Sequence, residues 1–248
     1  MKKTSFINKT KDTPLIIHIN PIGLIRAGKN NEERLNYLNE FLNDIKSSNG
    51  NIAIPTYSYS YAKNKLFDII KTPSELGEVS EYLRKRNVEK RTCDPNFSYL
   101  LFGNNFLNRH LKDGDSSSFG EGSFIEDIYL QDGYLGSIGG ALEYLTEIHY
   151  IEKKLNMDYR FDKVFKGKTI DIDGQVQFNN STFYCRNLGE KYNASFVQLK
   201  HDLLKENLIE EWKVNDISLK FQVIKFRKLF DFVKNKLINN PKYLWEQS

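Results

Sequence analysis

A histidine and a glutamate three residues apart are the strongest candidates for chemistry in this sequence. They are His149 and Glu152, in the segment TEIHYIE, whose apolar spacing predicts a helix over residues 142–155. In a helix this spacing places both side chains on one face. A carboxylate beside an imidazole fixes the tautomer of the ring and raises its basicity, so the pair could act as a general base. A surface ion pair has the same spacing, and the spacing alone does not decide between the two.

The remaining histidines and the cysteines offer less chemistry. His18 ends an apolar segment at a turn, where α/β proteins often build sites, although a hydrogen-bonded structural histidine is the better interpretation. His110 and His201 stand among charged residues and are expected at the surface. Cys93 and Cys185 are far apart and have no C-x-x-C partner. We therefore expect no disulfide and no metal site, and a cytoplasmic location.

Two glycine-rich clusters could present backbone amides to a phosphate or a carbonyl oxygen. They are SFGEGS at 118–123 and GSIGG at 136–140. Neither continues into the G-K-[ST] of a phosphate-binding loop, and no G-x-S-x-G or H-E-x-x-H motif occurs. A tight junction between a strand and a helix explains GSIGG equally well. The basic run RKRNVEKR at 84–91 could meet phosphates, or it could end a helix in solvent.

The elements that must position these groups follow an α/β pattern. Short apolar runs at 15–19 and 51–55 predict buried strands, and the segment 31–47 between them has its leucines at helical spacing. Thr72-Pro73-Ser74-Glu75 predicts a helix start through a capping box. Residues 94–123 predict long loops, and residues 169–186 predict a strand pair with a turn at Asp173-Gly174. Helices are predicted at 197–206 and at 222–238. We expect a single domain over 1–248, in which 165–248 either form a sub-lobe or pack on the same core.

Composition excludes several classes of protein. The chain has 248 residues, 40% of them hydrophobic and 27% charged, with a net charge of +4. This is ordinary for a globular protein. No stretch approaches the roughly 18 consecutive apolar residues of a membrane span, and the N-terminal segment has no signal-peptide run. The basic residues form no long stripe, so we expect no nucleic-acid partner.

Taken in order, these segments resemble the aminoglycoside 3-N-acetyltransferase-like enzymes, also called the antibiotic N-acetyltransferase family. The segment TEIHYIE is similar to the family's Thr-x-x-His-x-x-Glu, and SFGEGSF to its Phe-Gly-x-Gly-Ser loop. KRTCDPNFS is similar to Arg-Ser-x-His-Pro-x-x-Ser, and IPTYS to Pro-Thr-aromatic-Ser/Thr. The likeness extends to LIIHINPIGL, FDIIKTPSELGEVSEYLRKR, RFDKVFKG and FYCRNL, and so runs from about Leu15 to Leu244.

The resemblance implies a fold, a reaction and a set of site residues. The fold is α/β, with a mixed central β-sheet flanked by helices, and is distinct from the GNAT acetyltransferases. The reaction is direct transfer of an acetyl group from acetyl-CoA to an amine in a ternary complex, with His149 as general base oriented by Glu152 and no metal. The residues implied at the cofactor are Asn20, Thr56, Arg91, Ser98, Gly120 and Ser123, and those implied at the acceptor are Tyr57 and Asp94.

Two departures from the family pattern concern the acceptor and some of the contacts with the cofactor. Asp94 stands where the family has His before Pro, and the first turn reads Asn20-Pro21 instead of Ser-Ser. With the mild net charge, these differences favour an amino sugar as acceptor, free or nucleotide-linked for surface glycans, over an aminoglycoside antibiotic. A non-catalytic relative that binds acyl-CoA or a glycan is the alternative from another class. The chain is expected as a monomer or a homodimer.

Overall fold

A mixed β-sheet forms the centre of the molecule. The computed structural model describes residues 8, 10–47, 50–104, 106, 109–112, 117–140, 142–187, 194–214 and 219–245. In this part of the chain six strands lie in the order β4-β2-β1-β5-β9-β8. β1 pairs in parallel with β2 and β5, whereas the outer pairs are antiparallel. The strands are β1 (Leu15–Ile19), β2 (Ile52–Pro55), β4 (Tyr99–Phe102), β5 (Tyr134–Ile138), β8 (Glu210–Val214) and β9 (Leu219–Lys225).

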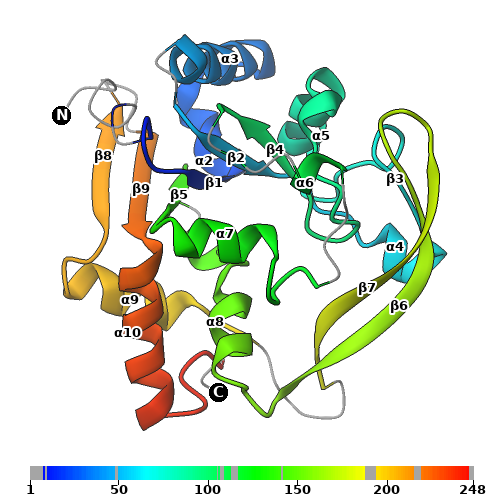
Figure 1. The fold of residues 1–248 in the computed structure, drawn as a ribbon. Coiled ribbons are helices and arrows are strands. Elements are labelled where there is room, and N and C mark those ends of the chain that lie inside the picture. Colours follow the sequence, from blue (N-terminus) through cyan, green and yellow to red (C-terminus); the bar gives the residue numbers. More distant parts are fainter. Residues whose placement is uncertain are drawn as a thin grey trace.

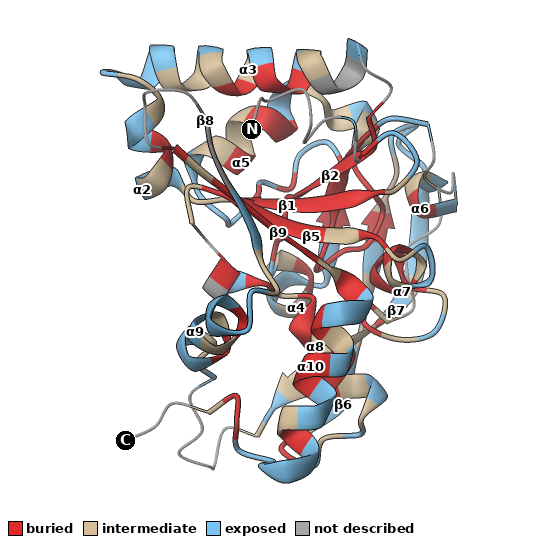
Figure 2. Ribbon diagram, turned by 90° about the vertical axis from the view of Figure 1, so that its left-hand side faces the viewer, coloured by how far each residue is buried: buried red, intermediate tan, exposed pale blue. Residues whose placement is uncertain are grey.

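Helices cover both faces of this sheet (Figure 1). The apolar sides of α3 and α5 pack on one face and those of α7, α8 and α10 on the other, so the molecule has three layers. Figure 2 shows the buried residues concentrated in the strands, with the outer side of α3 exposed. The predicted helix–sheet–helix fold is therefore confirmed. The helices are α2 (Pro21–Leu24), α3 (Asn31–Ser47), α4 (Ser60–Asn64), α5 (Glu78–Arg86), α6 (Arg109–Lys112), α7 (Phe124–Leu130), α8 (Ile148–Lys154), α9 (Val197–Lys205) and α10 (Phe226–Asn239).

Strand β1 divides its side chains between the two helical layers. Leu15 and Ile17 belong to the apolar cluster under α3, and Ile16 belongs to the cluster on the opposite face. Successive side chains of a strand point to opposite faces of its sheet. His18 therefore lies on the same face as Ile16, toward α8. This alternation brings a polar side chain from the centre of the sheet to the layer that carries His149.

A long hairpin arches away from the main body (Figure 1). β6 (Arg160–Ile170) and β7 (Val176–Arg186) pair along their whole length, and β3 (Leu66–Asp68) adds a parallel strand to β6. Gly174 has φ +79° in the connecting turn, a left-handed conformation that glycine adopts without a steric penalty. The predicted strand pair with its Asp173-Gly174 turn is confirmed, and it starts nine residues earlier than predicted, at Arg160 instead of Thr169.

The predicted helix start at Thr72 is wrong. The hydroxyl of Thr72 accepts the N–H of Asp68, and the carboxylate of Glu75 accepts the N–H of Tyr59, so neither caps a helix. Helix α5 begins at Glu78, after Gly77 with φ +97°. The turn residues were recognised, but their hydrogen bonds go to earlier segments of the chain.

Two further helix predictions need new limits. Residues 222–225 lie in strand β9, which pairs with β5, and the helix begins only at Phe226. The predicted helix over 142–155 is a 3₁₀ turn at Leu142–Tyr144 followed by α8 from Ile148 to Lys154. The other 3₁₀ turns are Ile25–Ala27 and Val88–Lys90. Among the described residues, no helix is both long and apolar enough to cross a membrane.

Candidate active site

His149 and Glu152 form a hydrogen-bonded pair on α8. Nδ1 of His149 lies 2.6 Å from Oε2 of Glu152, one helical turn further on. The Glu152 side chain is fully buried, whereas that of His149 is 19% exposed. Phe119 and Phe196 pack against the imidazole with their ring centroids 5.6 and 6.1 Å away. The sequence-based placement of both side chains on one face is confirmed.

Glu152 is held as a carboxylate by two residues at the base of the long hairpin. The Tyr159 hydroxyl donates to Oε1 at 3.0 Å, and Nε of Arg160 lies 2.7 Å from Oε2. Burial alone would raise the pKa of Glu152, but the charges of His149 and Arg160 and the Tyr159 hydrogen bond outweigh it, and the pKa is lowered. The carboxylate can only accept, so Nδ1 of His149 must donate. Nε2 of a neutral His149 then carries the lone pair that a general base needs.

A second buried histidine–carboxylate pair lies beside the first. Nε2 of His18 is 3.1 and 3.0 Å from the two carboxylate oxygens of Glu147, which is fully buried. The Tyr99 hydroxyl donates to Glu147 at 3.1 Å, and the Tyr57 hydroxyl donates to Tyr99 at 2.6 Å. Burial would raise the pKa of Glu147, but His18 and these hydrogen bonds keep it lowered. Burial and the nearby Glu147 raise the pKa values of both tyrosines well above 10.

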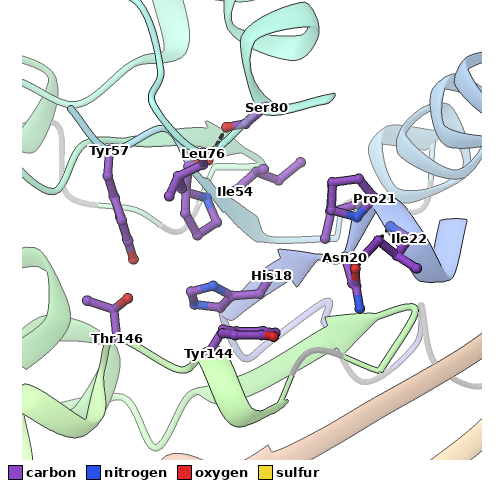
Figure 3. A pocket seen from close by; sticks show the side chains of 12 residues that line it. His18, Asn20, Pro21, Ile22, Ile54, Tyr57, Leu76, Ser80, Tyr144 and Thr146 are labelled. Carbon is purple, nitrogen blue, oxygen red and sulfur yellow. Dashed lines mark hydrogen bonds between the residues drawn. The ribbon is translucent and has the colours of Figure 1, made fainter. Parts of the chain in front are cut away.

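A cavity of about 420 Å³ opens beside His18. Figure 3 shows His18 and Tyr57 facing this cavity, with Tyr144 and Thr146 along one side. The carbonyl oxygen of Thr146 accepts the N–H of His149 at 3.0 Å, so the cavity reaches the first turn of α8. Most of the wall is apolar. It is lined by His18, Ile19, Asn20, Pro21, Ile22, Ile54, Pro55, Tyr57, Leu76, Ser80, Tyr144 and Thr146.

The chain matches the family model described as aminoglycoside 3-N-acetyltransferase over residues 26–238. This chain belongs to the aminoglycoside 3-N-acetyltransferase family. A search of curated proteins found no match. The family is one of acyltransferases.

Three solved structures share the fold of this family member. A sisomicin-bound AAC-VIa aligns with a TM-score of 0.70 at 15% identity, over 96% of this chain and 97% of its own. The YokD protein from Bacillus subtilis aligns with a TM-score of 0.71 at 17% identity, over 96% and 92%. AAC-IIIb in a binary complex with CoASH aligns with a TM-score of 0.71 at 14% identity, over 100% and 99%. At these identities the likeness shows the fold, which is that of the family.

Two of the residues that the family pattern implied line the cavity. Asn20 caps α2, because its Oδ1 accepts the N–H of Ile22 at 3.0 Å, and Tyr57 belongs to the Glu147 network. Gly120 lines another cavity, of about 550 Å³, together with Phe119 and Arg160. Ser123 is buried and caps α7 by accepting the N–H of Glu126.

Arg91, predicted at the cofactor, is enclosed by the protein. It is fully buried, and its guanidinium donates to the carbonyl oxygens of Ile69, Thr72 and Thr56 and to the Ser98 hydroxyl. Thr56 and Ser98 are equally buried and bond to each other. These contacts join the segments that follow β2 and β3 to β4. The described contacts of Arg91 are therefore with the protein itself.

Other polar residues also have structural partners. The carboxylate of Asp94 accepts the N–H groups of Asn96 and Phe97, so this departure from the family pattern shapes a turn. The expected exposure of His110 is wrong, since it is 2% exposed and lies 2.6 Å from Asp127. His201 is at the surface as expected. The basic run at 84–91 forms no single surface, because Arg84 and Arg91 are buried.

The sequence analysis did not predict Glu147 as a site residue or its hydrogen bond with His18. The two residues are 129 positions apart, and nothing in either segment signals that they meet. The available signal was the place of His18 at the end of a parallel strand. Among the described residues, no group of three His, Cys, Asp or Glu side chains could hold a metal ion.

Proposed function

We propose that this chain transfers the acetyl group of acetyl-CoA to a primary amine of an aminoglycoside-like acceptor. His149 accepts the amine proton, and the transfer is direct, without an acyl-enzyme. The observation that carries this proposal is the buried Glu152 carboxylate, which lies 2.6 Å from Nδ1 of a partly exposed His149.

The dyad supplies what aminolysis of a thioester requires. An alkyl amine is protonated near pH 7, because a reference amine such as lysine has a pKa of about 10.4. Only the free amine attacks a carbonyl carbon. His149 takes up the proton at Nε2, and Glu152 stabilises the imidazolium that forms. Positioned proton transfer of this kind contributes roughly 10²–10⁴-fold to the rate.

The cavity beside His18 suits the pantetheine arm of CoA. A slender chain with few polar groups fits a wall made mainly of isoleucine, proline and leucine, with Asn20, Ser80 and Thr146 as polar contacts. Thr146 belongs to the turn that carries His149, so an arm in this cavity would bring its thioester toward the base. Among known structures of this fold, AAC-IIIb is solved with CoASH.

The cavity of about 550 Å³ has the chemistry of an amine acceptor site. Two basic side chains in its lining already form ion pairs, because Lys153 lies 2.5 Å from Asp162 and Arg160 pairs with Glu152. Glu121 and Asp158 add exposed carboxylates to its lining, which can receive ammonium groups. The carboxylate of Asp94 accepts two backbone N–H groups in a turn, so Asp94 by itself does not favour an amino sugar over an aminoglycoside. An aminoglycoside, as seen in the sisomicin-bound relative, therefore takes precedence over a free or nucleotide-linked amino sugar.

A thiol-release assay tests the proposal. The chain is incubated with acetyl-CoA and each member of a panel of aminoglycosides, free amino sugars and nucleotide-linked amino sugars, and CoA is measured with a thiol reagent. We expect CoA release with aminoglycosides. CoA release with nucleotide-linked amino sugars alone would contradict the aminoglycoside acceptor and favour a role in glycan synthesis.

Variants then test the residue roles. His149→Ala should reduce turnover at least about 10²-fold while CoA still raises the melting temperature. His201→Ala changes an exposed histidine and is the matched control. Unchanged turnover in His149→Ala would remove the base assignment. CoA binding without release from any amine in the panel would favour the non-catalytic alternative.

A further inference from the structure

The side chain of Lys153 places an ammonium group in the cavity that we assign to the acceptor. Its Nζ is 2.5 Å from Oδ1 of Asp162 and 3.3 Å from the hydroxyl oxygen of Ser117. It also lies 5.3 Å from the centre of the Tyr184 ring. A carboxylate, a hydroxyl oxygen and an aromatic face each attract a cation. The protein thus fills, with its own side chain, a position that has the chemistry to bind an ammonium group.

Separate segments of the chain bring these groups together. Asp162 and Tyr184 are directly opposite each other in the β6–β7 hairpin, so their side chains lie on the same face of it. Lys153 belongs to α8, and Ser117 belongs to the segment before α7. A Cβ on Gly120 would come within 2.8 Å of the Ser117 hydroxyl oxygen, so the glycine leaves room for that hydroxyl. The arrangement therefore depends on how the hairpin packs against α8.

Exposure distinguishes Asp162 from the other carboxylates that pair with cations of this cavity. The Asp162 side chain is 49% exposed. The side chains of Glu126 and Glu152, which pair with the two other cations of the described lining, are 10% and 0% exposed. A half-exposed ion pair is weak, because water competes for both charges. An ammonium group of a ligand can therefore compete with Lys153 for this carboxylate.

We propose that the groups around Lys153 form a subsite for a second ammonium group of the acceptor, and that Lys153 limits acceptor affinity by occupying it. The subsite consists of the Asp162 carboxylate, the Ser117 hydroxyl and the Tyr184 ring. This inference rests on the proposed acetyl transfer, in which the first amine of the acceptor reacts at His149. Lys153 is thus a residue that determines specificity and takes no part in proton transfer.

The cavity lies beside the dyad, so one acceptor can contact both. Phe119 lines the cavity and packs against the His149 ring, and Arg160 lines it and pairs with Glu152. An acceptor with a single amine has no group left for the subsite when that amine is at His149. A polyamine has one, and it gains the contact when it displaces Lys153. Removing the lysine should therefore strengthen the binding of a polyamine.

The test measures the binding of sisomicin, an aminoglycoside with several amino groups. Lys153→Met removes the ammonium group and keeps an unbranched side chain. The Kd for sisomicin, measured by calorimetry, should fall about 3- to 10-fold, because the ligand gains an ion pair and a cation–π contact without competition. Lys153→Arg keeps a cation in the subsite and should retain the affinity of the unaltered chain. An unchanged Kd in Lys153→Met would overturn the subsite.

Lys154→Met is the matched control for charge. Lys154 lines the same cavity but pairs with Glu126, so this variant loses one positive charge without releasing Asp162. It should show a smaller gain in affinity than Lys153→Met. Equal gains in the two variants would reveal a general effect of charge and would contradict the subsite.

A double variant tests the carboxylate itself. Lys153→Met combined with Asp162→Asn should lose the gain in sisomicin affinity, because a neutral amide does not form an ion pair. A gain that persists in the double variant would remove Asp162 from the subsite. If the unaltered chain releases no CoA from sisomicin, the acetyl-transfer proposal fails. Tighter sisomicin binding by Lys153→Met would then still support an ammonium subsite, whereas an absence of binding in every variant would overturn it.

Discussion

Arg160, the first residue of the long hairpin, places its Nε 2.7 Å from Oε2 of Glu152. The same oxygen lies 2.6 Å from Nδ1 of His149. One carboxylate oxygen in α8 is therefore shared by an arginine from the hairpin and a histidine from its own helix. This relationship connects the carboxylate partner of the candidate base to the first residue of β6.

Replacing Glu152 by glutamine should impair both activity and stability. The amide cannot stabilise the imidazolium that forms when His149 accepts the amine proton, so kcat should fall about 10- to 100-fold. Arg160 would also lose its buried counter-charge, at a cost of about 3 kcal/mol. Steady-state rates and urea unfolding measure the two effects. An unchanged kcat would show that Glu152 does not influence the base.

Acid should destabilise the fold through the buried carboxylates. The pKa values of Glu147 and Glu152 are lowered in the folded chain from an ordinary 4.5. The unfolded chain therefore takes up protons first as the pH falls, so stability that is complete above about pH 5 is lost progressively below it. Melting temperatures between pH 7 and pH 3 test this. Glu147→Gln should flatten the decline, whereas Glu89→Gln, at an exposed glutamate, should not.

Arg91 should prove to be a structural residue. Its guanidinium satisfies three carbonyl oxygens and a hydroxyl in a fully buried site. Arg91→Met should lower the free energy of unfolding by about 3 kcal/mol, since these acceptors lose their donors. Arg86→Met, at an exposed arginine over the Tyr82 ring, is the control with a small effect. Wild-type stability with weakened CoA affinity in Arg91→Met would instead indicate direct contact with the cofactor.

A close backbone contact supports the cavity. A Cβ on Gly23 in α2 would overlap the carbonyl oxygen of Gly139, which follows β5 with φ +84°. Gly23→Ala should push α2 and Asn20 away from the sheet, raise the KM for acetyl-CoA and lower the melting temperature. Gly140→Ala adds a Cβ in open space at φ +83°, so it carries backbone strain without the overlap. A KM that rises equally in both variants would contradict the packing explanation.

Local signals in the sequence predicted much of the fold. The leucine spacing gave α3 with its limits, 31–47, because its apolar face packs on the sheet as the pattern requires. The helix start predicted at Thr72 was wrong, because the side chains of Thr72 and Glu75 accept hydrogen bonds from the earlier residues Asp68 and Tyr59 and do not cap a helix. Residues 222–225 lie in a strand because β5 offers them a partner, which a local pattern does not show.

The candidate site divides in the same way. His149 and Glu152 were found because a helix brings residues three apart together. Tyr159 and Arg160, which complete the Glu152 environment, follow the end of α8 and carry no motif. His18 and Glu147 meet only once β1 and α8 are packed in their final positions. Partners within one helix could be predicted from the sequence, whereas those that depend on how separate segments pack could not.

The alternation of side chains along β1 has a consequence for how this strand can evolve. Ile17 faces the layer of α3, and His18 faces α8 and Glu147. Inserting or deleting one residue within the strand would reverse this parity, so that an isoleucine would meet the buried carboxylate and the imidazole would enter an apolar layer. Insertions or deletions within β1 that keep this arrangement must therefore involve an even number of residues. Whether His18 can reach Glu147 thus depends on its position along the alternating strand as much as on its imidazole.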